Sequence, residues 1–215
     1  MPLGVGCSSD PGDLSQGTDR GSGDPGGAPV EPANPPAKPG PAPKHDPTFA
    51  ETTLARAQLW IDAQMPYCGG PNGGKDVICG GTCSRTGAAE KAEWDKYRSD
   101  CSGFVSWSWG LSAPGETTRT LAPYDTTVSS LITVDDLQPG DALNGSGTSH
   151  VMLFGGWADK AAGKATILQE SRCGTTAAEK IAVFKTLDTT TLQIEDGRKF
   201  RPIRYKTAGS SAASK

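Results

Sequence analysis

Proline and glycine at the start of this 215-residue chain limit which part of it can fold. Eleven of the 17 prolines lie within residues 1–47, and Val30 is the only large aliphatic side chain after Leu14 in that stretch. Such a segment buries too little apolar surface to offset the entropy lost on ordering. We therefore expect a disordered linker over 1–46, one compact domain over 47–206 and a flexible tail over 207–215.

Charge and hydropathy exclude two classes of function. The formal net charge is −3, so no basic surface predicts a nucleic-acid partner. No stretch of the sequence is apolar enough for a membrane span. Residues 1–10 nevertheless resemble the end of a lipoprotein signal, with small residues before Cys7 and a polar run after it. Either Cys7 is a lipid anchor, or it is an ordinary cysteine in a disordered arm.

Six cysteines are many for a cytosolic protein of this size and favour an exported, oxidising compartment. Four of them can form two disulfides in three connectivities, which the sequence leaves open. The alternative is a zinc site with Cys79 and Cys83 as half of its ligands, but their spacing is not that of a tight CxxC pair. The disulfide candidates are Cys68, Cys79, Cys83 and Cys173.

The order of the expected elements favours an α+β fold. Apolar spacing predicts a helix over 53–64, a short helix over 88–97 and a buried helix over 101–109. A turn over 134–143 leads into a strand. Helices followed by consecutive strands indicate an antiparallel sheet rather than alternating βαβ units. The further strand candidates are 150–157, 164–170, 180–186 and 200–205.

Cys101 and His150 are the candidates for nucleophile and base. Cys101 begins the expected helix after the capping residue Asp100, where the helix dipole favours a thiolate. His150 is the only imidazole within the expected domain, because the other histidine, His45, lies in the linker. The alternatives are a structural cysteine and an edge histidine that serves no reaction.

Four motifs in order resemble the NlpC/P60 family of cysteine peptidases, which cleave bacterial cell-wall peptides. They are Pro66-Tyr67-Cys68-Gly69-Gly70, Asp100-Cys101-Ser102-Gly103-Phe104-Val105, Leu137-Gln138-Pro139-Gly140-Asp141 and His150-Val151-Met152-Leu153-Phe154-Gly155. The resemblance implies a papain-like core in which N-terminal helices pack on an antiparallel β-sheet. It also implies that no metal or cofactor takes part.

Roles follow residue by residue from this resemblance. Cys101 would be the nucleophile, His150 the general base, and Tyr67 a donor to the oxyanion. The residue that orients the imidazole would be Gln169 or Glu170, whose side chains point to opposite faces of one strand. The interval from Gly70 to Asp100 is longer than is usual in the family, which bears on specificity more than on chemistry.

The expected function is hydrolysis of amide bonds in peptidoglycan stem peptides through a Cys-His acyl-enzyme. We expect a monomer in the periplasm or cell envelope. One form is an outer-membrane lipoprotein, in which the only contact with the membrane is a lipid on Cys7. Two alternatives stay open. One is an amidase, acyltransferase or toxin that acts on another substrate, and the other is a non-catalytic envelope protein held together by disulfides.

Overall fold

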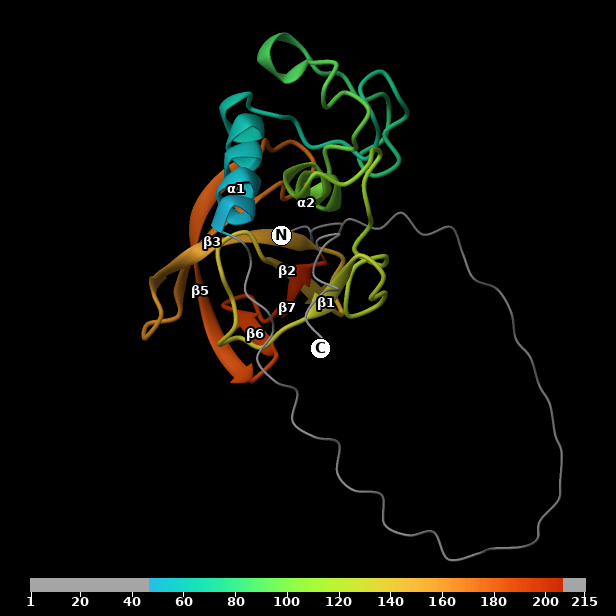
Figure 1. Cartoon of the computed structure of the whole chain (residues 1–215). Coiled ribbons are helices and arrows are strands. Elements are labelled where there is room, and N and C mark those ends of the chain that lie inside the picture. Colours follow the sequence, from blue (N-terminus) through green and yellow to red (C-terminus); the bar gives the residue numbers. More distant parts are fainter. Residues whose placement is uncertain (1–46, 207–215) are drawn as a thin grey trace, which may run out of the picture.

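The computed structural model describes residues 47–206; the expected linker with Cys7 and His45, and the expected tail, lie outside the described residues. Two α-helices and one 3-10 turn precede a run of strands (Figure 1). The helical elements are α1 (Pro47–Asp62), η1 (Gly87–Ala89) and α2 (Cys101–Trp109). The strands are β1 (Ser129–Leu131), β2 (Ala142–Ser146), β3 (Val151–Asp159), β4 (Lys164–Gln169), β5 (Ala178–Asp188), β6 (Thr191–Ile194) and β7 (Lys199–Tyr205).

Six of the strands close into an antiparallel barrel. The sheet order is β1-β7-β2-β3-β4-β5-β6, and an additional pairing of β6 with β7 joins its two sides. Leu192 lies opposite Phe200 at this closure. Strand β1 stays outside the ring as a short edge paired with β7. Closure satisfies the backbone groups that an open sheet would leave unpaired at its margins.

The expected α+β papain-like core, with N-terminal helices packed on an open antiparallel sheet, is therefore wrong. The domain is mostly β, with only two α-helices over residues 47–206. Strands β1 and β6 were not expected, and the short helix expected over 88–97 is a single 3-10 turn followed by hydrogen-bonded turns. The closure depends on β6 and β7, which form one short hairpin. In the barrel, β6 also pairs with β5, and β7 also pairs with β2.

The apolar core of the domain consists of two clusters. One lies between the helices and the outer face of the barrel, where Phe104 and Val105 of α2 pack with Val151, Leu153 and Leu168. The other fills the barrel. Alternation along β3 and β4 assigns successive side chains to the two clusters. The buried members of the barrel cluster are Ile132, Val134, Leu137, Leu143, Met152, Phe154, Ala165, Ile167, Phe184, Leu192 and Phe200.

Helices α1 and α2 lie together on one side of the barrel, away from β6 (Figure 1). Trp60 of α1 packs on Phe104 of α2, with ring centroids 5.9 Å apart. Gly110 ends α2 in the left-handed conformation with φ 72°, as expected of a glycine in that place. Within residues 47–206, neither helix has the length and hydropathy that a bilayer span requires.

Candidate functional site

Helix α2 begins at a well-capped N-terminus. The Asp100 carboxylate accepts hydrogen bonds from the backbone N–H of Gly103 at 2.7 Å and from the hydroxyl of Ser102 at 2.8 Å. Arg98 Nε donates to the other carboxylate oxygen at 2.9 Å. These contacts fix the first turn of the helix and leave its dipole directed at Cys101.

Gly103 permits the chain to pass close to this turn. A Cβ at this position would lie 1.9 Å from the carbonyl oxygen of Arg98. The Asp-Cys-Ser-Gly sequence thus combines a cap, a hydroxyl that binds the cap and a residue without a side chain. Each of these features has a local structural reason, whatever reaction takes place here.

Cys101 is fully buried and disulfide-bonded in this structure. Its side chain belongs to the cluster between the helices and the barrel, together with Tyr67, Val151 and Leu168. A disulfide sulfur is not a nucleophile, so chemistry at Cys101 requires prior reduction of this bond.

His150 and Gln169 form a hydrogen-bonded pair. His150 Nε2 lies 2.7 Å from Gln169 Oε1, and the ring of Phe200 meets the imidazole edge-on at a centroid distance of 6.3 Å. The amide oxygen can only accept, so Nε2 carries the proton and Nδ1 keeps a lone pair. Of the two residues proposed to orient the imidazole, Gln169 is the one bonded to it.

Burial is the main reason why the pKa of His150 is lowered to about 4. The hydrogen bond that His150 donates to Gln169 raises the pKa, whereas the nearby cations Arg198 and Lys180 lower it further. The imidazole is therefore neutral at pH 7, as a general base must be.

Glu170 points to the opposite face from Gln169 and is fully buried. Neither of its carboxylate oxygens has a hydrogen-bond partner. Burial raises the pKa of Glu170 well above its usual range, the Asp100 carboxylate raises it further, and Arg85 opposes both. Burial therefore favours the neutral form of the Glu170 carboxyl group beside the start of α2.

Tyr67 belongs to the same buried region. Its pKa is raised by burial first, and then by the carboxylate of Asp100. The phenol consequently keeps its proton at neutral pH and can act as a hydrogen-bond donor.

The start of β3 and the end of β4 lie at one end of the barrel wall, where Leu153 pairs with Leu168. Helix α2 starts at this end, beside Glu170, and finishes further along β3, where Trp109 Nε1 donates to Gly140. The backbone N–H of Gly140 in turn donates to Phe154. Chain topology therefore brings Cys101, His150 and Gln169 to the same end of the sheet but to opposite faces of it. Cys101 packs with Val151 and Leu168 outside the barrel. His150 meets Phe200 on the inner side, where Gln169 also lies. A contact between Cys101 and His150 stays a prediction.

The four disulfide candidates pair as Cys68–Cys83 and Cys79–Cys173. The first bond closes the glycine-rich loop after α1, and the second ties residues 75–99 to the segment after β4. These two bonds indicate an oxidising, exported environment. Cys79 and Cys83 therefore belong to different disulfides and do not form the half zinc site that the sequence left open.

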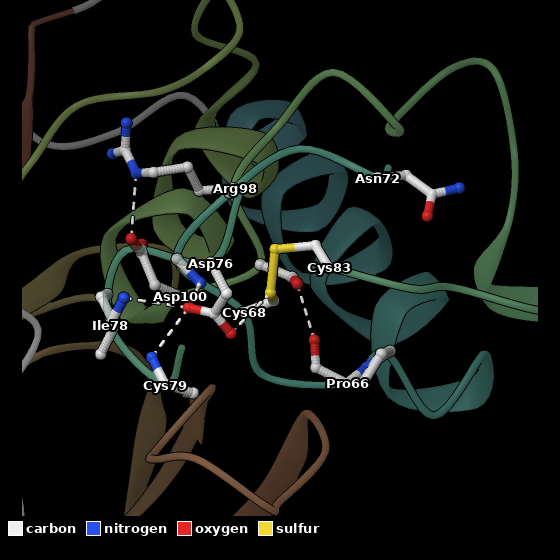
Figure 2. The surroundings of a disulfide bond; sticks show 12 residues. Pro66, Cys68, Asn72, Asp76, Ile78, Cys79, Cys83, Arg98 and Asp100 are labelled. Atoms are coloured by element: carbon white, nitrogen blue, oxygen red, sulfur yellow. Dashed lines mark hydrogen bonds and ion pairs between the residues drawn. A yellow bond between two sulfur atoms is a disulfide. The ribbon is translucent and has the colours of Figure 1, made fainter. Parts of the chain in front are cut away.

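Asp76 lies against the Cys68–Cys83 disulfide (Figure 2). One carboxylate oxygen accepts the backbone N–H groups of Gly69, Ile78 and Cys79 at 3.1, 2.9 and 2.8 Å. The other lies 2.8 Å from the sulfur of Cys68, which carries no hydrogen while it is part of a disulfide. The three groups are close enough to share a metal ion, but only after reduction to thiolates.

Two further features had no motif in the sequence. Arg85 is buried and donates to the carbonyls of Trp94 at 3.0 Å and Tyr97 at 2.6 Å, which organises residues 75–99. A pocket at one mouth of the barrel is lined by Gln169, Lys180 and Arg198 among others. The pairing of β4 with β5 and of β5 with β6 brings these polar residues together.

No protein-family model matches the chain, and no curated protein matches it.

Proposed function

We propose that the chain is a cysteine hydrolase that cleaves amide bonds in bacterial peptidoglycan stem peptides, with the chemistry of the NlpC/P60 peptidases. The observation that carries the proposal is the placement of Cys101 at the capped N-terminus of α2. His150, which Gln169 holds, lies at the same end of the sheet but on its inner face, so the reaction requires the imidazole to turn towards Cys101. The four motifs shared with that family support the choice of substrate.

In the proposed reaction, Nδ1 of His150 takes the proton of the Cys101 thiol, and the thiolate attacks the amide carbonyl. The oxyanion is stabilised by the Tyr67 hydroxyl and by backbone N–H groups at the start of α2. His150 then gives its proton to the leaving amine, and the C–N bond breaks. Water attacks the thioester with His150 as base, which releases the acid and restores the thiol.

The reaction begins only after the Cys101 disulfide is reduced, because the sulfur is oxidised in this structure. A dithiol reductant of the cell envelope would supply two electrons and two protons and would itself become a disulfide. The neutral side chain of Glu170, next to Asp100, limits the negative charge around the thiolate. A second carboxylate there would raise the pKa of the thiol.

We further propose that the protein acts as a monomer in the cell envelope, where the peptidoglycan lies. A lipid on Cys7, which lies outside the described residues, would fix the protein to the outer membrane and would exclude that cysteine from any disulfide. The linker expected over 1–46 is long enough to carry the domain from a membrane to the wall.

A second candidate is a non-catalytic envelope protein in which Cys101 is structural. It is favoured by one specific observation, namely that Cys101 is both fully buried and disulfide-bonded. A third candidate keeps the Cys-His chemistry and changes the substrate to another amide or ester.

The test is digestion of purified peptidoglycan by the full chain after mild reduction, with wild type beside Cys101→Ala and soluble products read by mass spectrometry. New muropeptides from wild type alone support the hydrolase and identify the bond. No products, with rapid alkylation of Cys101 by iodoacetamide, would favour another amide or ester substrate. No products and a Cys101 that resists alkylation would favour the structural protein.

A further inference from the structure

One mouth of the barrel holds a pocket of about 300 Å³. Its size lies at the lower end of the range for small-molecule sites. The inner wall is apolar, and polar groups stand around it. The apolar wall is formed by Met152, Ile167, Ala182 and Ile194.

Lys180 is the cation without a partner in this pocket. Over residues 47–206, its ammonium group makes no hydrogen bond and no ion pair, and Lys180 is exposed at the pocket mouth. Arg198 differs, because its guanidinium is paired with Asp196 at 2.8 Å within the turn between β6 and β7. Glu195 and Asp196 stand at the exposed rim. An ammonium without a counter-ion beside an apolar wall can pair with the anionic group of a ligand.

Cations at the pocket mouth act on two titratable groups, Lys180 in the pocket and His150 next to Gln169. The pKa of Lys180 is lowered by burial first and then by Arg198 and Arg172, and Asp196 opposes these cations as the smallest effect. The pKa of His150 is also lowered by burial first, and by Arg198 and Lys180, again with Asp196 as the smallest effect. The acidic residues of the rim therefore do not neutralise the interior of the pocket.

Gln169 adds a polar group that is already oriented. It lines the pocket and is buried, and its amide oxygen is held by His150. With that oxygen engaged, the amide nitrogen is left as the donor that a ligand oxygen can use. A cation, an amide donor and an apolar wall thus lie within one small cavity.

We propose that this pocket binds the carboxylate end of a short apolar peptide, with Lys180 as the counter-ion and aliphatic side chains against Met152 and Ile167. Arg198 strengthens the field from the rim while it stays paired with Asp196. The site does not depend on the reaction proposed at Cys101, and binding is expected with or without cleavage.

The first test is calorimetric titration of the full chain with N-acetyl-Ala-Ala as the free acid and as its C-terminal amide. The acid should bind about tenfold more tightly than the amide, because only the acid satisfies Lys180. Lys180→Met should remove this difference. Lys185→Met is the matched control, since Lys185 lies on the same strand and faces the other way, and it should preserve the difference.

The second readout is the imidazole of His150, followed by NMR during a pH titration. A bound carboxylate places a negative charge in the field that now lowers the pKa of His150, so saturation with the acid should raise that pKa from about 4, and the amide should not. Saturable binding of the acid with both effects would support the site. Equal binding of acid and amide, no binding of either, or equal loss in Lys180→Met and Lys185→Met would overturn it.

Discussion

Arg204 and Asp141 form a two-point ion pair inside the domain. Arg204 Nε donates to one carboxylate oxygen of Asp141 at 2.9 Å and Nη2 donates to the other at 2.8 Å, and both side chains are buried. Asp141 belongs to the Leu137–Asp141 motif, one of the four on which the proposed resemblance to cysteine peptidases rests. Its observed role is to tie the start of β2 to β7.

Removing one partner of this pair should destabilise the fold strongly. Arg204→Met leaves the Asp141 carboxylate buried without its counter-ion and should cost about 3–5 kcal/mol of unfolding free energy. Urea denaturation followed by tryptophan fluorescence measures the loss. The matched control is Lys160→Met, which breaks the exposed Lys160–Asp135 pair and should cost less than about 1 kcal/mol. Similar losses in the two variants would contradict the prediction.

Gly103→Ala should destabilise the start of α2. The new methyl group would lie 1.9 Å from the carbonyl oxygen of Arg98, so the backbone must shift, at a cost of about 3 kcal/mol. Gly147→Ala is the control, since Gly147 has a φ of 77° but nothing within 4 Å of the added carbon. It should cost only about 1 kcal/mol from the left-handed backbone. Thermal unfolding compares both variants, and an equal effect would show that the contact with Arg98 is relieved easily.

His150 should make the domain acid-sensitive. Its pKa falls from 6.5 in the unfolded chain to about 4 in the folded protein, so the unfolded state binds the proton more readily. The stability of the folded state is therefore complete above about pH 6.5 and declines towards pH 4 by roughly 3 kcal/mol. His150→Gln should flatten this part of the stability profile, measured as urea midpoints against pH. A profile that keeps its wild-type slope would show that other groups dominate.

Glu170 should act in the opposite direction. Its folded pKa is raised, so the unfolded state loses its proton first as pH rises, and the native state is increasingly penalised above about pH 4.5. Glu170→Gln keeps the shape without that penalty and should stabilise the protein by about 1–3 kcal/mol at pH 7 and little at pH 4. Exposed Glu179→Gln serves as the control and should change neither value. Destabilisation by Glu170→Gln at pH 7 would indicate an ionised Glu170 paired in the folded state.

Local patterns in the sequence predicted local structure well. Helix α2 has the predicted bounds 101–109, with Asp100 and Gly110 as its caps, because capping depends on residues within one turn. The strand expected over 164–170 corresponds to β4, which ends one residue earlier, at Gln169. Helix α1 begins at Pro47 rather than near 53, because Thr and Ala in its first turns give no apolar stripe.

Closure of the sheet could not be predicted in the same way. Strand β6 has only four residues, and its sequence does not determine which strands it pairs with. Three-residue β1 gives no alternating pattern at all. The choice between Gln169 and Glu170 also could not be made from the sequence. Alternation predicts that the two side chains point to opposite faces of β4, but not which of them meets His150.

Strand β7 pairs with β1, β2 and β6. During synthesis, β1 to β6 leave the ribosome before it, and none of these three pairings can form until residues 199–205 have emerged. The nascent chain must hold an unclosed sheet with apolar inner side chains until then. A ribosome stalled shortly before this strand would therefore present an aggregation-prone intermediate, and chaperone binding should peak there and fall once β7 is released.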